Sequence, residues 1–413
     1  MSPALSELCL KVRGLDVSGF ELSDDIEELA LHAESHKELL SATADRVVVD
    51  PSFRDDLCDL GILQVIMDNK GPEIDSLEDL SRICGSHRGL RMVIGSSQMV
   101  NVGLFEEVSA MVLGCEFNPS AVSFATMLCS GITANKKRFL GFVPELISLL
   151  SVCLKPICSA QIELLICLLA DDDKINRSDP CIVMTRNTLM EQGKNFVALR
   201  NIVMLCRDSG SHTLTLSLID IMSCSNAYSY MLAIDDGHLK WVMDVIHGLR
   251  VLEQRSTALT CIKIIRTWSF SDDLKELILA RVIEEYEQLL VLANSSAPAT
   301  KHVFATLANL SLRNPDVALT ILNQMPYLEE LINKTMRVDA FEKSRTPCMQ
   351  FLRTLVRSED GRYACSDLCN VFDVMITDPS LKDCDRRLVG EIMGRLKNGD
   401  ISSNAATVEL TGN

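Results

Sequence analysis

Hydrophobic positions recur at helical spacing through most of the chain. Val303, Leu307 and Leu310, for example, stand at i, i+4 and i+7, which places three apolar side chains on one face of a helix. Signals for strands are scarce: the β-branched run at 47–49 is short, and the Asp236-Gly237 pair lies between two helical patterns. The pattern therefore predicts an all-α fold.

The predicted helices also repeat. Six short apolar segments end in a small or polar cluster, and a seventh, at 164–169, fits between the second and the third. We call the fourth or fifth residue of each segment its anchor, and the anchors are Ile83, Leu128, Leu168, Ile221, Ile265, Leu310 and Leu355. Successive anchors are 45, 40, 53, 44, 45 and 45 residues apart. Stacked helical repeats have periods of roughly 40–47 residues, so the spacing predicts such a stack.

A second apolar landmark follows most anchors at a fixed distance. The step is 18 residues to Leu146, Leu239, Ile283 and Leu328, and 17 residues from Leu355 to Phe372. Each unit is therefore predicted to hold an anchor helix, a polar turn with a short helix, and another apolar helix. Asn314-Pro315 is expected to cap and start one of the short helices. Because one unit cannot bury its apolar face alone, neighbouring units must stack to form a continuous core.

Two segments resemble the armadillo repeat. They read Thr-Leu-Ala-Asn-Leu-Ser at 306–311 and Pro-Glu-Leu-Ile-Ser-Leu-Leu at 144–150. The resemblance extends over residues 50–398 and implies an α–α superhelix, an armadillo-like solenoid of about seven repeats. The related HEAT repeats obey the same physics, so the pattern does not separate the two. In armadillo proteins the anchor helices line a concave groove that binds protein segments.

Departures from the period predict the domain organisation. Residues 1–46 are expected to form an acidic N-terminal helical cap, and residues 47–381 the repeats. The long step between anchors predicts an insertion at about 171–195, which fits either a binding loop or a linker without function. Residues 382–398 are expected to form a C-terminal capping helix, and residues 399–413 a disordered tail.

The charge is uneven along the chain. Among 413 residues, 56 are acidic and 40 basic, which gives a net charge of −16, and residues 1–80 alone carry −13. An acidic surface repels phosphate, so nucleic acid and anionic membranes are disfavoured as partners. A basic protein partner would suit the N-terminal part. The acidic run at 24–28 is equally explained as the first turn of a helix capped by Ser23.

The 16 cysteines lack the even spacing of a disulfide framework, and the first residues do not resemble a secretory leader. We therefore expect reduced thiols and a cytoplasmic location, with the nucleus also open. The longest apolar stretch, at 146–169, is interrupted by Lys155, Pro156, Gln161 and Glu163, so no membrane insertion is expected.

Catalytic and cofactor motifs are absent from the sequence. No phosphate-binding loop, dinucleotide fingerprint, nucleophile elbow or His-Glu-x-x-His motif occurs, which predicts a non-enzyme without cofactor, metal or small-molecule substrate. His32 and His36 lie four residues apart, as do Cys365 and Cys369, but neither pair has an evident third metal ligand. Solvated histidines and buried thiols are the simpler interpretation.

Binding residues are expected on the anchor helices near the C-terminus. An asparagine amide on such a helix can clamp a peptide main chain, but among residues preceding an anchor only Asn309 is asparagine. A basic cluster follows nearby, and the candidate groove set is Asn309, Arg313, Gln350, Arg353, Thr354 and Arg357. These arginines would pair with an acidic partner or with the acidic N-terminal segment, unless they are merely a solvated face.

The function expected from these features is that of a non-enzymatic scaffold or adaptor that binds a protein partner. The alternative is a regulatory subunit or exchange factor acting on a small GTPase or a kinase, which rests on fold analogy. An enzyme with its site in the 171–195 insertion is a third hypothesis, but no acid, base and nucleophile can be named there.

Overall fold

The computed structural model describes residues 35–59, 77–96, 104–114, 118–152, 159–170, 179–223, 226–248, 254–379 and 381–398. The chain divides into an N-terminal unit, residues 1–221, and a C-terminal unit, residues 222–413. Helices account for nearly all of the described residues, and none of those residues lies in a strand. The prediction of an all-α fold is therefore confirmed.

The helices of the N-terminal unit are mostly of seven to sixteen residues. They are α3 (Ser35–Val49), α4 (Phe53–Asp59), α6 (Leu77–Cys84), α7 (Arg88–Ser96), α8 (Leu104–Leu113), α9 (Pro119–Cys129), α10 (Thr133–Phe139), η2 (Leu140–Phe142), α11 (Val143–Val152), α12 (Ser159–Leu169), α13 (Pro180–Glu191), α14 (Gly193–Asp208) and α15 (His212–Ser223), the last of which ends across the boundary between units.

The C-terminal unit continues with the same kind of helix. Its described elements are α16 (Asn226–Tyr230), the π-helix η3 (Met231–Asp235), α17 (His238–Gly248), α18 (Arg255–Trp268), α19 (Asp272–Glu284), α20 (Tyr286–Ser295), α21 (Ala297–Leu310), α22 (Pro315–Gln324), α23 (Leu328–Arg337), η4 (Asp339–Phe341), α24 (Glu342–Leu355), α25 (Glu359–Ala364), η5 (Ser366–Leu368), α26 (Cys369–Thr377) and α27 (Asp383–Asn398).

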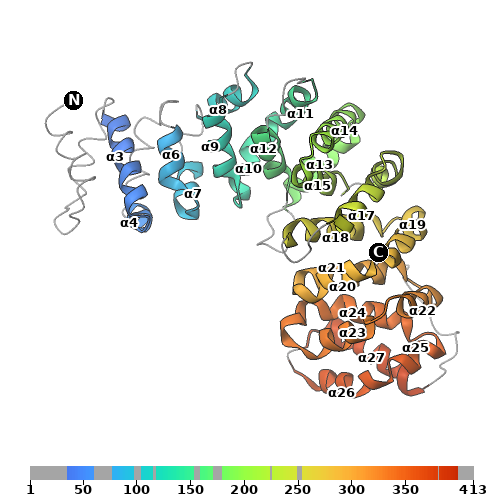
Figure 1. Cartoon of the computed structure of the whole chain (residues 1–413). Coiled ribbons are helices and arrows are strands. Elements are labelled where there is room, and N and C mark those ends of the chain that lie inside the picture. Colours follow the sequence, from blue (N-terminus) through green and yellow to red (C-terminus); the bar gives the residue numbers. More distant parts are fainter. Residues whose placement is uncertain are drawn as a thin grey trace, which may run out of the picture. The chain divides into compact units, whose positions relative to one another are not determined.

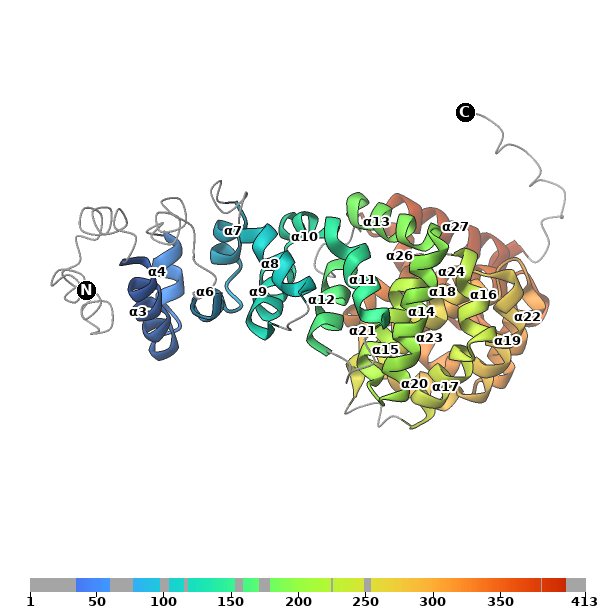
Figure 2. The same ribbon diagram turned by 90° about the horizontal axis from the view of Figure 1, so that it is seen from above.

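Six anchor-carrying helices, α6, α9, α12, α18, α21 and α24, stack in rows together with α3 and α27, and we call these eight the anchor helices. In the N-terminal unit α3 packs on α6, α6 on α9 and α9 on α12, and both views show these helices in chain order (Figures 1 and 2). In the C-terminal unit α18 packs on α21, α21 on α24 and α24 on α27 (Figure 1). All seven anchors are buried near the ends of helices: Ile83, Leu128, Leu168, Ile221, Ile265, Leu310 and Leu355. Where successive anchors lie 40 to 45 residues apart within one unit, their spacing thus identifies real helix-to-helix contacts.

Further rows cover the anchor rows. In the N-terminal unit α8 packs on α11 and α11 on α14, while the short helices α4, α7 and α10 contact one another in sequence. In the C-terminal unit α20 packs on α23, and α22 contacts α25. Each unit therefore has the layering of a helical solenoid, in which every helix triplet shares its apolar faces with the next.

The described residues include parts of the expected caps and of the expected insertion. α27 spans Asp383–Asn398, where a capping helix was expected, and α3 includes residues 35–46 of the expected N-terminal cap. Within the expected insertion, Pro180–Glu191 forms α13, which packs on α12 and α14. Residues 1–34, 171–178 and 399–413 lie outside the described residues.

Side-chain caps start several helices. Asn314 Oδ1 accepts a hydrogen bond from the Val317 amide at 3.2 Å, and Pro315 occupies the first turn of α22. The predicted cap is confirmed. Asn118 caps α9 in the same way, with Pro119 in the first turn. These caps satisfy amides that have no partner inside the helix.

Basic side chains close the other ends of anchor helices in the N-terminal unit. Arg54 on α4 donates to the carbonyl oxygens of Ile83 and Arg82, at 2.8 and 3.0 Å, near the end of α6. Arg91 on α7 donates to the carbonyls of Met127 and Ser130, at 3.0 and 2.7 Å, near the end of α9.

Lys136 on α10 makes the same kind of contact in the following repeat. Its Nζ donates to the Ala170 carbonyl oxygen at 2.9 Å, just past the end of α12. A cation from one repeat thus donates to unpaired carbonyl oxygens at the end of a helix in the next repeat, and it complements the dipole of that helix.

We predict that Leu310→Asp destabilises the C-terminal unit by about 3 kcal/mol or more, because it buries an unpaired charge between α18 and α24. Urea unfolding followed by circular dichroism measures this loss. Leu312→Asp is the matched control, since Leu312 is 60% exposed and Leu310 only 5%. Equal unfolding of both variants would contradict the assigned packing.

Arg91→Met is expected to lower the free energy of unfolding by about 2 kcal/mol, because it removes three charge-assisted hydrogen bonds, two of them to carbonyls at the end of α9 that are left without donors. Arg88→Met, on the same helix but exposed, should change stability by less than about 0.5 kcal/mol. Thermal melts of the two variants compare them directly, and equal melting temperatures would exclude the capping role.

Candidate partner-binding surface

The six candidate residues come from two adjacent helices of the C-terminal unit. Asn309 lies in the last turn of α21, and Arg313 lies in the turn that follows it. Gln350, Arg353 and Thr354 lie on α24, and Arg357 comes two residues after its end. Because α21 and α24 pack against each other, the structure brings this set to one region.

Two of the candidates serve the stack. Asn309 Nδ2 donates to Ser269 Oγ at 2.9 Å and reaches the Arg266 carbonyl oxygen at 3.5 Å, so the amide joins α21 to the end of α18. The side chain of Thr354 is buried within the packed helices. Gln350, in contrast, is exposed. The amide of Asn309 is thus used in a contact between repeats, whereas clamping a peptide would require a free amide.

Arg353 joins two anchor helices at the surface. Its Nε lies 2.6 Å from Glu391 Oε2 on α27, and the two side chains are 44% and 38% exposed. An ion pair with this exposure contributes about 0–1 kcal/mol to stability. The pair therefore positions Arg353 more than it stabilises the fold.

Three other arginines lie near enough to Arg357 for their charges to act on it. Burial, followed by the charges of Arg395 and Arg353 and, more weakly, Arg313, lowers the pKa of Arg357, and Glu391 acts in the opposite direction. Arg357 Nε is buried without a hydrogen-bond partner. We call Arg313, Arg353, Arg357 and Arg395 the arginine cluster. Guanidinium groups from α24, from α27 and from the turn after α21 thus lie near Arg357, and the Glu391 carboxylate contacts one of them, that of Arg353.

Arg395 was missed in the reading of the sequence. It lies on α27, 40 residues after the anchor Leu355, whereas the preceding anchors are 45 residues apart. The period alone therefore did not identify it. Because α27 packs on α24, the last helix contributes to the surface as well as closing the stack.

Arg313 has an unusual backbone conformation. Its φ is +62°, in the left-handed region that glycine adopts without strain. In the N-terminal unit Gly131, with φ +71°, occupies the equivalent place: each residue comes three positions after its anchor, Leu128 or Leu310. An arginine therefore stands where the turn after α9 has a glycine.

Positive charge extends along the anchor row beyond the arginine cluster. Arg266 Nη1 lies 3.0 Å from His302 Nδ1, which links α18 to α21. Burial and the charges of Arg266, Lys263 and Lys301 lower the pKa of His302 to about 3, so the imidazole is neutral and accepts the hydrogen bond from Arg266.

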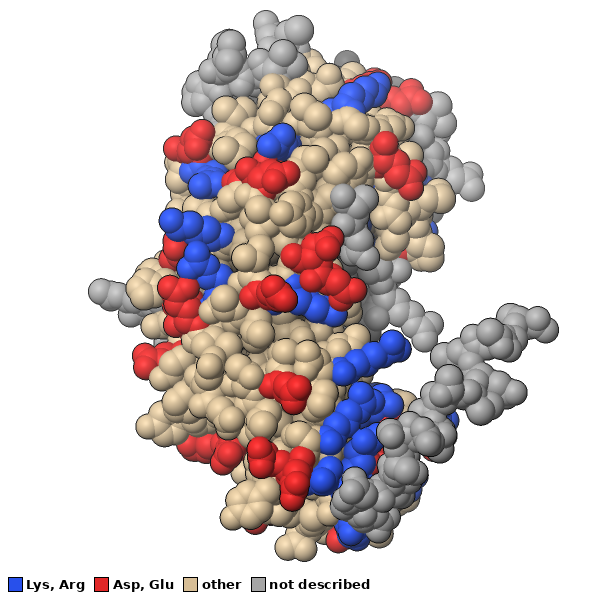
Figure 3. Space-filling model, turned by 90° about the vertical axis from the view of Figure 1, so that its right-hand side faces the viewer, with Lys and Arg blue, Asp and Glu red and all other residues tan. Residues whose placement is uncertain are grey.

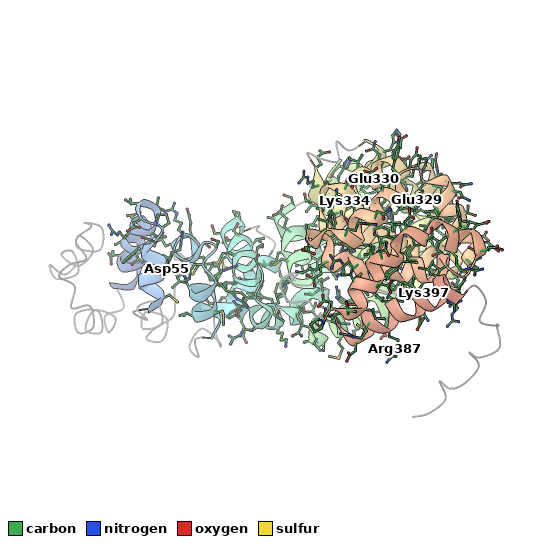
Figure 4. All side chains as sticks on the ribbon, turned by 90° about the horizontal axis from the view of Figure 1, so that it is seen from below. Asp55, Glu329, Glu330, Lys334, Arg387 and Lys397 are labelled. Atoms are coloured by element: carbon green, nitrogen blue, oxygen red, sulfur yellow. The ribbon has the colours of Figure 1, made fainter. Side chains whose placement is uncertain are left out.

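Basic side chains gather on one part of the surface. Figure 3 shows lysine and arginine side chains in a band along one edge of the face in view, while basic and acidic side chains are mixed elsewhere on that face. Figure 4 shows Glu329, Glu330 and Lys334, all on α23, at the opposite side of the C-terminal unit from Arg387 on α27, so the α23 side carries both signs of charge.

A hollow of about 480 Å³ lies in the N-terminal unit, beside the ends of α9 and α12 and the start of α15. Lys136 and Glu163 are among its lining residues, together with Cys167 and Ser217. The Lys136 ammonium donates to the Ala170 carbonyl, so it is committed to closing α12.

Other chemistry is limited. No group of three or more histidine, cysteine, aspartate or glutamate side chains within the described ranges could hold a metal ion. Burial raises the pKa of the Cys84 and Cys261 thiols to about 12, so both stay protonated and pack as apolar groups. No helix among the described segments is long and apolar enough to cross a membrane. His32 lies outside the described residues.

No family model matches the chain, and no curated protein matches its sequence. Among solved structures, the chain is similar to the crystal structure of an engineered protein from the Northeast Structural Genomics Consortium, with a TM-score of 0.55. The alignment covers 96% of this chain and 99% of that chain, at 13% sequence identity. At this identity the likeness concerns the fold alone, and it agrees with an all-α arrangement of stacked helices.

We predict that Arg313→Gly raises the free energy of unfolding by about 0.5–1 kcal/mol. Relief of left-handed strain gains about 1–2 kcal/mol, and the greater freedom of glycine in the unfolded chain offsets part of it. Gly131→Arg is the reciprocal variant and should be destabilising, although no atom crowds that position. Urea unfolding of both variants checks the prediction. A stability loss in Arg313→Gly would mean that the side chain itself stabilises the turn.

Proposed function

We propose that this chain is a non-enzymatic scaffold or adaptor that binds an acidic segment of a partner protein along the exposed side of the anchor helices α18, α21, α24 and α27. The observation that carries the proposal is the accumulation of positive charge on that side, above all the arginine cluster. We also assign the helix triplets to the armadillo type, since the segments at 144–150 and 306–311 resemble that repeat. Residues 299–398 further resemble armadillo-repeat-containing protein six.

The geometry of stacked helices favours an extended partner. An extended segment that crosses α21, α24 and α27 meets basic side chains from each of them in turn. Complementary charge also raises the rate of association and rejects basic competitors. The chain carries −16 overall, so a long polyanion such as nucleic acid would be repelled by most of its surface. A short acidic protein segment fits a local basic patch better.

The double variant Arg353→Glu, Arg357→Glu tests the proposal. A partner is first captured with the tagged wild-type chain, identified, and purified. We expect its Kd to rise about tenfold or more in the double variant, with the helical circular dichroism signal unchanged, because two attractive charges become repulsive. Added salt should weaken the wild-type complex for the same reason.

Lys343→Glu is the control for charge reversal on the same helix. Lys343 is exposed in the first turn of α24, where an acidic residue is favoured by the helix dipole. It should leave the Kd unchanged. An unchanged Kd in the double variant would overturn the proposed surface.

A further inference from the structure

We propose that Arg313, Arg353, Arg357 and Arg395 form a site for the phosphate group of a phosphorylated serine or threonine in the partner's segment. This inference rests on the proposed function and names the chemistry that the same surface recognises. It is argued from the residue type, the unsatisfied donors, the backbone of Arg313 and the exposure of the site.

The residue type favours phosphate over a single carboxylate. All four cations are arginines, whose planar guanidinium groups bind phosphate oxygens through paired hydrogen bonds. A phosphoserine carries about −1.5 to −2 charges at neutral pH and three acceptor oxygens. Among the described residues, the carboxylate whose charge acts on Arg357 is that of Glu391, already within 2.6 Å of Arg353. Three guanidinium groups therefore remain for an incoming anion.

The donors of the cluster are mostly unused. The side chains of Arg313, Arg357 and Arg395 form no hydrogen bond or ion pair with any residue that the structure describes. The Nε of Arg357 is also shielded from solvent without an acceptor. Buried polar groups without partners are unfavourable, and a bound anion is one way to supply the missing acceptor. A phosphate oxygen has the charge and the acceptor capacity for this position.

The backbone of Arg313 supports the same conclusion. The equivalent turn after α9 uses Gly131 for its left-handed residue, so the repeat can make this turn without strain. At Arg313 the chain accepts a strained conformation and thereby keeps a guanidinium beside Arg357. Strain that the fold does not require is a reason to look for a role of the side chain.

The exposure of the cluster favours a protein-borne phosphate. Arg313 and Arg395 are exposed and Arg353 is partly so, whereas a small free anion is usually held in an enclosed pocket. Leu312, beside Arg313, is strongly exposed and offers an apolar contact to a residue flanking the phosphate. The overall charge of −16 opposes anionic membranes and nucleic acid.

The test uses the full chain and three fluorescent peptide libraries that differ only at a fixed central residue: phosphoserine, serine or glutamate. Fluorescence polarisation at physiological ionic strength measures each affinity. We expect the phosphoserine library to bind about tenfold tighter or more than the serine library, and tighter than the glutamate library. Inorganic phosphate in excess should compete with the phosphoserine library.

Variants assign the preference to the cluster. Arg357→Gln combined with Arg395→Gln should abolish the preference for phosphoserine, and Arg357→Lys should reduce it, because lysine keeps the charge but loses the paired donors. Lys343→Gln should keep the preference in full. Arg313→Gly should weaken phosphopeptide binding while raising the melting temperature, a combination that a merely structural residue would not produce.

Several results would overturn the inference. Equal binding of the serine and phosphoserine libraries, or a preference that survives in the Arg357→Gln, Arg395→Gln variant, excludes a phosphate site at the cluster. Equal binding of the glutamate and phosphoserine libraries likewise excludes phosphate specificity, but leaves the acidic-segment function intact. That function fails separately, if Arg353→Glu, Arg357→Glu binds the purified partner as tightly as the wild-type chain. Stronger binding of anionic lipid vesicles than of the phosphoserine library would also contradict the inference.

Discussion

Each helix triplet in this protein has more apolar surface than it can bury by itself, and the rest of the structure depends on how that surface is shared. α21 shows the arrangement: it packs on α18 and α24 at once, and its anchor Leu310 is buried between them. Stacking then repeats every surface position at the period of the core. Side chains that are isolated in the sequence, such as Arg313 and Arg357, become neighbours because their helices share one apolar spine.

The ends of the helices are where stability and binding meet. Every stacked helix leaves carbonyl oxygens unpaired at its last turn, and its dipole there favours cations. In the N-terminal unit, Arg54 and Arg91 donate to such carbonyl oxygens and thereby join one repeat to the next. In the C-terminal unit the arginine cluster lies at or just past the ends of α21, α24 and α27. The dipoles of these ends, together with the Glu391 carboxylate, offset part of the repulsion among the cations.

Periodic features were readable from the sequence, whereas contacts between units were not. The anchors and the Asn314 cap depend on local spacing, so their positions followed from the pattern. Ile283 shows the limit: it falls in the last turn of α19 and not in a covering helix, since α19 is longer than the short helix expected there. The bond from Asn309 to Ser269 joins residues 40 positions apart, and no local rule distinguishes it from a free surface amide. The sequence therefore indicated three arginines of the cluster, Arg313, Arg353 and Arg357, but not Arg395.

A repeated fold separates the positions that hold the stack from those that face solvent, and this separation explains where function can arise. Buried anchors such as Leu355 tolerate little change, because each contacts the neighbouring unit. Exposed positions on the same helix, such as Gln350, carry no such constraint. Arg313 belongs to neither class, since its side chain is exposed but its backbone adopts a conformation that glycine would accept more easily. A position that costs stability and contributes nothing to packing is best explained by what its side chain binds.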